Sequence, residues 1–320
     1  MKKSTIPVSV IIPLYNSGEF LVECINSINT SKEIPTEIIV IDDCSTDDSY
    51  EIATQLARNF GNINLLQTSR NSGAALARKK GFDAAIEELV AIIDADDFIE
   101  EGAIADAYSQ IDESIDLCIW EMWKYNDDGS KFKHKANPEK FPLSGNEALL
   151  RSFGQWQVHP LGIARKKLYL DAYKLLNIDS YNSDELITRI LFKNSRKITG
   201  SSKKYFYRTN FKSTTLSVSD KHLTLLRSQI WLFKLALATN GAPASNVIKQ
   251  GIESAYKFYK SRINYSRNAI SAEITTFVKS AASIPMFWPR VLFMPKHAAI
   301  FILLAKYLFF PETAPENSGR

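Results

Sequence analysis

The chain has 320 residues, of which 45% are hydrophobic and 23% charged, so it is an ordinary globular protein and neither a disordered nor a fibrous one. Its cysteines, Cys24, Cys44 and Cys118, are odd in number and widely spaced, which excludes a disulfide framework and favours a reducing, cytoplasmic compartment. The net charge of +4 is uneven, because residues 1–100 carry 8 Lys/Arg and 16 Asp/Glu whereas residues 191–320 carry 20 and 5.

The first hundred residues alternate between predicted strands and helices. The opening apolar stretch is interrupted by Pro7, Ser9 and Pro13, which indicates a first strand and not a signal peptide. The strand candidates are β-branched runs with almost no polar interruption, typical of parallel strands covered on both faces. Four runs are expected to be these strands: Val8–Ile12, Glu37–Ile41, Ile63–Gln67 and Leu89–Ile93. The alternation predicts an α/β domain with a mostly parallel, twisted, Rossmann-like sheet and flanking helices.

Helix starts between these strands carry recognisable signals. Glu19 follows Asn16 by three residues, in the capping-box position of the first helix. Ser45 or Thr46 is expected to cap the second helix. The segment 71–73 is expected to open a third, alanine-rich helix whose small residues allow close packing on the sheet.

The pattern loosens after residue 100. The run Asp116–Tyr125 is typical of a strand, and Asn126–Gly129 is expected to turn it into a hairpin. Lys203–Arg208 is a further candidate, expected at the edge of the sheet.

The C-terminal part is predicted to be a basic helical extension. We place the domain boundary near residue 215, so that residues 1–215 form the α/β domain and residues 216–320 the extension. Residues 285–310 are strongly apolar but interrupted at Pro295, which leaves less than the roughly 20 residues that a spanning helix needs. Flanking aromatic and cationic residues favour a helix lying on an anionic membrane surface. The alternative is a helix packed back on the protein or in a dimer. Nucleic acid is not an expected partner, because the basic residues are dispersed and no binding motif accompanies them.

Acidic residues cluster where two predicted strands end. Asp42 and Asp43 follow the second strand, and Asp94, Asp96 and Asp97 follow the fourth. Carboxylates gathered at one sheet edge repel each other unless a cation or hydrogen-bond donors satisfy them. Mg²⁺ or Mn²⁺, which takes one or two carboxylates plus substrate phosphates, suits this arrangement.

Four motifs in this order resemble those of the family 2 glycosyltransferases, which have the GT-A fold. The resemblance is dense over about residues 6–100 and traceable to about residue 216. The motifs are Val8-Ser-Val-Ile-Ile-Pro-Leu-Tyr-Asn16, Glu37-Ile-Ile-Val-Ile-Asp-Asp-Cys-Ser45, Asn71-Ser-Gly-Ala-Ala-Leu-Ala-Arg78 and Ile92-Ile-Asp-Ala-Asp-Asp97.

The resemblance implies a nucleotide-sugar donor and assigns residues to it. Tyr15 would border the base, and Asp42 or Asp43 would accept from its imide N–H. Asp94 would reach the ribose, and Asp96 would bind the Mn²⁺ or Mg²⁺ that bridges the diphosphate. The same motifs place five further residues beside the donor: Pro13, Asn16, Asn71, Gly73 and Ala95.

Four basic residues have weaker assignments from the resemblance. Arg78 would lie near the base or phosphates, or is a plain helix-surface arginine. Arg208 would face the diphosphate, or pairs with a surface acid. His222 would be a third metal ligand by analogy with related folds. His159 would bind the acceptor, although a lone histidine is usually structural.

An inverting transfer also needs a base for the acceptor hydroxyl. In the family this is commonly the aspartate of a Glu-Asp pair that opens a helix. Asp184 matches that position, with Ser183 in place of the glutamate, and Glu185 is the rival. Local helix capping would also explain an aspartate at Asp184.

The sequence therefore predicts an inverting, metal-dependent transferase that moves one sugar from a nucleotide donor, UDP-linked, to a glycan or lipid-linked saccharide. The Gln-x-x-Arg-Trp motif and spanning helices of the family's processive synthases are absent, so repeated addition is not expected. The setting would be cell-surface polysaccharide assembly, with the protein at the inner face of the cell membrane. Two alternatives remain: a nucleotidyltransferase on a similar fold, and a non-catalytic protein that binds sugar nucleotides.

Overall fold

A computed structural model describes residues 4–29, 33–138, 140–153, 156–174, 183–209, 220–261 and 265–309. The chain divides into two compact units. Unit 1 falls within Met1–Ile178 and Ile187–Ser213, and unit 2 within Asp179–Leu186 and Thr214–Arg320.

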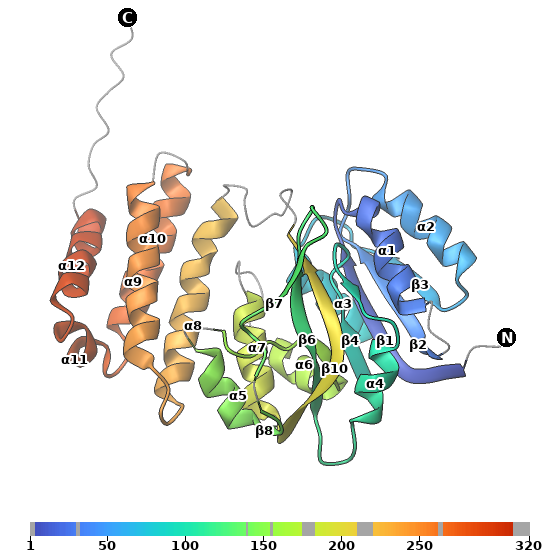
Figure 1. The fold of residues 1–320 in the computed structure, drawn as a ribbon. Helices are drawn as coiled ribbons and strands as arrows, with labels where there is room; N and C mark the ends of the chain where they lie inside the picture. The colour runs from blue at the N-terminus through green and yellow to red at the C-terminus, as the bar shows by residue number, and fades with distance from the viewer. Residues whose placement is uncertain are drawn as a thin grey trace, which may run out of the picture. The chain divides into compact units, whose positions relative to one another are not determined.

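Unit 1 is built on one sheet with the strand order β3-β2-β1-β4-β9-β6-β10-β5, to which β7 adds beside β6 and β8 beside β10 (Figure 1). The strands are β1 (Ser4–Leu14), β2 (Glu33–Asp42), β3 (Ile63–Gln67), β4 (Leu89–Ile92), β5 (Phe98–Ile99), β6 (Leu117–Tyr125), β7 (Lys131–Lys133), β8 (Leu143–Ser144), β9 (Gly162–Arg165) and β10 (Lys197–Arg208). The four strands predicted in the first hundred residues are confirmed as β1 to β4, and they are parallel to their neighbours in this set.

The second half of the sheet is mixed. β9 is antiparallel to both β4 and β6, whereas β10 is parallel to β6. The strand predicted over Lys203–Arg208 is part of β10. It lies between β6 and the short strands β5 and β8, so it does not form the edge of the sheet. The hairpin is confirmed, because the Gly129 N–H donates to the Asn126 carbonyl at 2.9 Å and Gly129 has a φ of 80° that favours glycine.

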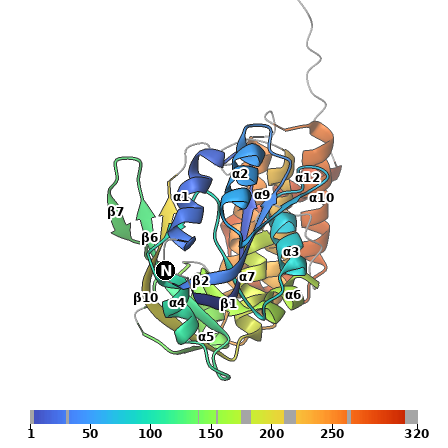
Figure 2. The ribbon, with the colours of Figure 1, turned by 90° about the vertical axis from the view of Figure 1, so that its right-hand side faces the viewer.

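Helices cover both faces of the sheet (Figure 2). One face carries α1 (Gly18–Asn29), α2 (Ser49–Asn59) and α4 (Ala103–Ser109), and the other carries α3 (Ala74–Ala84) and α6 (Lys166–Lys174). The remaining helices are α5 (Gly145–Ser152) and α7 (Ser183–Asn194), and the first turn of α7, up to Leu186, is assigned to unit 2. The alternation along β1 explains the two layers: Val10 and Ile12 lie in the core beneath α1, and Ile11 points to α3.

The close packing predicted for the third helix is confirmed at Gly81 of α3. A Cβ atom on Gly81 would lie 2.6 Å from Cγ2 of Ile11 and 2.8 Å from Cδ1 of Ile41. Both distances are shorter than a non-bonded contact permits, so only glycine lets α3 approach β1 and β2 this closely.

The predicted caps of the first two helices are wrong. Ser45 and Thr46 do not open the second helix, because the Asn16 N–H donates to Ser45 Oγ at 3.1 Å and the Thr46 N–H donates to Asn16 Oδ1 at 2.8 Å. The helix begins later, at Ser49, whose Oγ accepts from the Gly18 N–H at 2.8 Å and so caps α1. The polar residues between β2 and α2 therefore bind the neighbouring loop in place of their own helix.

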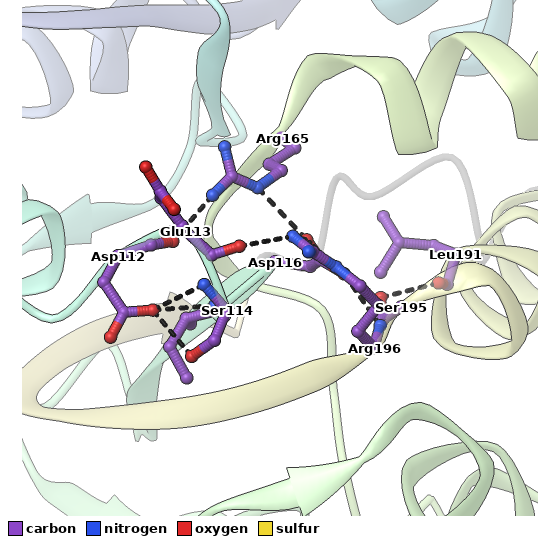
Figure 3. A network of polar contacts seen from close by, with 9 residues as sticks. Asp112, Glu113, Ser114, Asp116, Arg165, Leu191, Ser195 and Arg196 are labelled. Carbon is purple, nitrogen blue, oxygen red and sulfur yellow. Dashed lines mark hydrogen bonds and ion pairs between the residues drawn. The ribbon is translucent and has the colours of Figure 1, made fainter.

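A buried carboxylate, Asp116, joins three segments of unit 1 at the start of β6 (Figure 3). Its oxygens accept from Nε of Arg165 at 3.1 Å, and from Nη2 at 2.6 Å and the backbone N–H at 2.7 Å of Arg196. The two guanidinium groups also donate to the carbonyls of Asp112 and Glu113. Burial acts to raise the pKa of Asp116, but the Arg196 and Arg165 hydrogen bonds outweigh it and the pKa is lowered.

We expect Asp116→Ala to lower the free energy of unfolding by about 2–3 kcal/mol, because the change removes the acceptor that two guanidinium groups share. The loss is smaller than for a fully buried ion pair, because Arg196 is exposed. Because the pKa of Asp116 is lowered in the folded state, this stabilisation is fully present above the unfolded-state pKa of about 3.9. It is lost as the pH falls through the folded-state pKa. Urea unfolding at pH 7 and in acid measures both effects. Asp83→Ala is the control, because Asp83 is exposed and pairs with Lys79 within one helix. An equal loss in the two variants would contradict the prediction.

Unit 2 is helical in its described part. It contains η2 (Asp220–Thr224), α8 (Leu225–Leu237), α9 (Ala244–Lys260), α10 (Arg267–Ala282), α11 (Phe287–Leu292) and α12 (Pro295–Phe309). The predicted interruption at Pro295 is confirmed, because α12 begins there, and further breaks separate α8, α9, α10 and α11. Within the residues that the structure describes, every helix is too short or too polar to cross a bilayer.

Candidate active site

The carboxyl ends of β1, β2, β3 and β4 meet at one edge of the sheet. Leu14 is paired with Asp42 and Asp42 with Gln67, so three neighbouring strands end at the same level. β4 ends slightly earlier, because its last residue, Ile92, is opposite Ile11, three residues before the end of β1. The residues that follow these strands therefore share the edge at which doubly wound sheets bind ligands. Tyr15, half-buried, stands directly after β1 at this edge.

Asp42 is fully buried at the end of β2. Its carboxylate accepts from Nε2 of Gln67 at 2.9 Å and from the backbone N–H of Ser45 at 3.3 Å. These two donors fix the carboxylate and offset the cost of its burial.

Asp43 is also buried, and it organises the loop before α3. Its carboxylate accepts from Thr68 Oγ at 2.8 Å, from the Ser72 N–H at 3.0 Å and from the Gly73 N–H at 2.6 Å. Gly73 has a φ of 87°, a conformation that disfavours other residues. The amide groups before α3 therefore bind a carboxylate of the protein in this structure. Asn71, at the outer end of the same loop, is exposed.

Asn16 and Pro13 shape the first strand end. Asn16 lies in the left-handed region with a φ of 48°, and its side chain bonds to Thr46 in the loop after β2. Pro13 is in register with Ile41 inside the sheet. Both residues are placed where the donor is expected, and both hold the backbone of this edge.

Arg78 reaches from α3 to the end of β4. Its Nη2 lies 2.7 Å from Oδ1 of Asp94, and the guanidinium group is largely buried. The alternative reading of Arg78 as a plain surface residue is therefore wrong. The ion pair places one positive charge among the carboxylates at the donor edge. Ala95, the next residue along the chain, is buried.

The residues after β4, 94–97, form what we call the acidic turn. Asp97 binds this turn to β10, a role that the sequence did not predict. Its buried carboxylate accepts from the Tyr205 hydroxyl at 2.6 Å and from the Arg208 N–H at 2.8 Å. The same tyrosine oxygen accepts from the Asp94 N–H at 3.2 Å. Burial raises the pKa of Asp97, and the charges of Asp96 and Asp94 raise it further. The sequence signal for this role was the third acidic residue in the run after β4.

Arg208 takes up the acid-pairing role that was one of its two predicted alternatives. Its guanidinium group forms an ion pair with Glu23 of α1, and its Nε donates to the Asp96 carbonyl at 2.8 Å. The guanidinium carbon lies 4.9 Å from the ring centres of both Phe20 and Tyr125. Arg208 therefore holds the backbone of the acidic turn through a hydrogen bond and does not depend on a substrate for its partners.

The acidic turn fits a hard divalent cation that also has ligands from a substrate. Asp97 faces the interior, Asp94 is paired with Arg78, and Asp96 is half-buried at the turn. Among the residues described, no cluster of three or more His, Cys, Asp or Glu side chains forms a complete metal cage. A site with one or two carboxylates and room for phosphate oxygens is what Mg²⁺ and Mn²⁺ use in nucleotide enzymes. His222 belongs to η2 of unit 2, and its role as a third ligand stays a prediction.

His159, the predicted acceptor-binding residue, is buried between α5 and β9 in the chain. It is only 4% exposed, and its Nδ1 accepts from the Leu161 N–H at 3.1 Å. Burial lowers the pKa of His159 to about 3, with a smaller contribution from His134. The side chain is therefore buried and neutral, and its acceptor role stays a prediction.

The two candidates for the base open α7. Asp184 is exposed and Glu185 is half-buried in the first turn of this helix, after the buried Ser183. The helix start that was predicted here is confirmed, and the assignment of the base stays a prediction.

The matches with known proteins cover the part of the chain that forms this edge. Residues 9–166 match the model of glycosyl transferase family 2. GlyG, a glycosyltransferase of Streptococcus pneumoniae, is 29% identical over 59% of this chain and 61% of its own length. TarS, a poly(ribitol-phosphate) beta-N-acetylglucosaminyltransferase of Staphylococcus aureus, is 32% identical over 63% of this chain and 35% of its own length. The matched region thus spans less than two thirds of these relatives.

Solved structures support the same fold. The crystal structure of S. aureus TarS 1-349 in complex with UDP-GlcNAc aligns over 97% of this chain and 93% of that chain, with a TM-score of 0.64 and 19% identity. This similarity confirms the α/β, GT-A-like fold that was predicted. The family match over residues 9–166 shows that this part of the chain is a glycosyl transferase family 2 domain.

Proposed function

We propose that this protein transfers a single sugar from a UDP-sugar to a glycan or lipid-linked saccharide in cell-surface polysaccharide synthesis, with a divalent metal ion and with inversion at the anomeric carbon. The observation that carries the proposal is the acidic edge, where Asp42 and Asp43 stand at the end of β2 and Asp94 and Asp96 follow β4, the two strands on either side of β1. The named activity of TarS and its complex with UDP-GlcNAc support the choice of donor class.

The residues of this edge have separate tasks in the proposal. Asp42 or Asp43 accepts from the base, and Tyr15 borders it. Asp94, oriented by Arg78, accepts from the ribose hydroxyls, since a carboxylate with one oxygen in an ion pair keeps further acceptor positions.

Asp96 would hold Mn²⁺ or Mg²⁺ together with the donor diphosphate. Such an ion neutralises the charge that builds on a departing nucleoside diphosphate. The protein's part is to keep Asp96 in place, and it does so through its neighbour. Asp97 bonds to Tyr205 and to the Arg208 N–H, and Arg208 Nε binds the Asp96 carbonyl, so the turn has little freedom to move.

Asp184 would take the proton of the acceptor hydroxyl. An exposed carboxylate at the start of a helix can meet a soluble or lipid-linked acceptor without a change in the core. Glu185 is the second candidate for this role.

Release of free nucleotide tests the proposal. We expect the purified protein to liberate UDP from at least one UDP-sugar in the presence of Mn²⁺ or Mg²⁺, to lose this activity with a chelator, and to regain it when Mn²⁺ is restored. A panel of UDP-, GDP- and CMP-sugars, with NMR of the transferred sugar's anomeric configuration, measures donor choice and inversion.

Each alternative has a distinct result in the same assay. Activity that a chelator leaves unchanged would contradict metal dependence. Formation of a nucleotide sugar and pyrophosphate from a sugar phosphate and a nucleoside triphosphate would indicate the nucleotidyltransferase, which the family match does not favour. Tight binding of UDP-sugars without turnover for any acceptor glycan would indicate the non-catalytic protein.

A further inference from the structure

An exposed apolar surface surrounds α11 in unit 2. Met286, Trp288, Leu292 and Phe293 are exposed by 55%, 44%, 66% and 89%, and we call these four residues the α11 patch. Met286 has a φ of 69°, which is unusual for a residue other than glycine. Large apolar side chains scattered singly on a surface need no explanation, but four within eight residues form a patch of the kind that marks an interaction site.

The surface continues onto the outer face of α12. The ring centres of Trp288 and the buried Phe301 are 5.6 Å apart, so α11 and α12 are in contact beside the patch. Phe301 and Leu304 pack inward, towards α9 and α10, whereas Ile302 and Leu303 are 49% and 42% exposed. One face of α12 therefore packs on the protein, as one of the two predictions for this segment has it, and the other face remains apolar and exposed.

Along the chain, the charge around the α11 patch has one sign, and the acidic side chain that contacts this segment is Glu253 of α9, 2.9 Å from Nε2 of His297. Residues 274–309 contain no Asp or Glu and four cations, Lys279, Arg290, Lys296 and Lys306. Lys296 is exposed at the start of α12, and Arg290 lies beside the patch, where its Nη1 donates to the Met286 carbonyl at 3.2 Å. Apolar side chains surrounded by cations match an anionic bilayer interface, which accepts the former among its acyl chains and attracts the latter to its head groups.

We propose that the α11 patch and the outer face of α12 bind unit 2 to the surface of an anionic lipid bilayer, with Trp288, Leu292 and Phe293 inserted at the interface. A protein partner or a second copy would also bury apolar area, but neither accounts for the absence of acidic residues over 36 positions. Binding is expected to need both parts, because a short apolar patch or a few cations alone gives weak, reversible attachment.

Sedimentation with vesicles tests the proposal on the full chain. We expect the protein to pellet with vesicles of phosphatidylglycerol and phosphatidylcholine, and much less with phosphatidylcholine alone. Added salt should weaken the binding, because it screens the cationic part. The double variant Leu292→Glu/Phe293→Glu should bind the anionic vesicles at least about tenfold more weakly, since it removes two inserting side chains and adds two negative charges.

The matched control is Trp231→Glu. Trp231 is also an exposed aromatic residue of unit 2, 45% exposed, but it lies on α8, where its partner is Lys234. This variant should bind vesicles as the unchanged protein does. Release of UDP from a UDP-sugar in the absence of vesicles should be the same in all three proteins, so failure of the membrane proposal and failure of the catalytic one are separate results.

Two results would overturn the membrane proposal. One is equal binding of the double variant and the unchanged protein to anionic vesicles. The other is an absence of vesicle binding by the unchanged protein together with a dimer that the double variant dissociates, which would assign the α11 patch to a second copy.

Discussion

Replacing Asp96 by alanine should lower nucleotide release and sugar transfer by at least about 100- to 1000-fold. The expected loss is this large because Asp96 is the half-buried carboxylate that we assign to the metal ion, and that ion would neutralise the charge that builds on the departing diphosphate. The fold should survive, because the side chain lies at a strand end and outside the hydrophobic core. Steady-state rates at several Mn²⁺ concentrations, together with circular dichroism, measure both points.

The control for this experiment is again an exposed aspartate of unit 1, Asp83, whose replacement by alanine should leave the rate unchanged. A drop in rate that high Mn²⁺ partly restores would strengthen the assignment, since it would locate the defect in metal affinity. Undiminished turnover by Asp96→Ala would rule out the proposed role of the acidic turn.

Asp184→Asn should lower the rate of transfer by about 100- to 10,000-fold while leaving the affinity for the donor unchanged. The amide cannot accept the acceptor's proton, but asparagine is as well tolerated as aspartate at a helix start, so a role in capping alone predicts almost no change. Calorimetric titration with UDP and rate measurements over a range of acceptor concentrations separate the two effects.

Glu185→Gln is the matched variant for the second candidate. If this change removes activity and Asp184→Asn does not, the base is Glu185. Full activity in both variants would show that the base does not come from the start of α7.

Much of the fold followed from the sequence where hydrophobic periodicity was strong. The apolar runs that became β1, β2 and β4 are buried on both faces, and few other structures can accommodate them, whereas β3 at the end of the sheet is half-buried. β9 was missed because its four residues, Gly162–Arg165, show no alternation, and because its pairing with β4 and β6 depends on segments more than 35 residues away. Short strands of this kind are determined by tertiary packing and not by local preference.

The site was predictable in its list of residues and less so in their partners. The positions of Tyr15, Asp42 and Asp94 follow from parallel strands ending at one edge. The bond between Asp97 and Tyr205 joins residues 108 apart in the chain, and no spacing rule points to it. The misassignments of Ser45 and Thr46 have the same origin, because a hydroxyl near a helix start can bind a neighbouring loop as readily as its own helix.

The missing side chain of Gly81 has a consequence for charge. Arg78 precedes Gly81 by three residues, so both lie on the sheet-facing side of α3. The spacing between this helix and the strands, which Ile11 and Ile41 restrict to what glycine permits, sets how far the Arg78 guanidinium extends towards Asp94. A single methyl group at position 81 would push the helix outwards and weaken that ion pair. Gly81 thus affects the site although it has no atom that could touch a substrate. In a screen of variants for activity, a change at Gly81 would resemble a change of the acidic residues more than a change in the core.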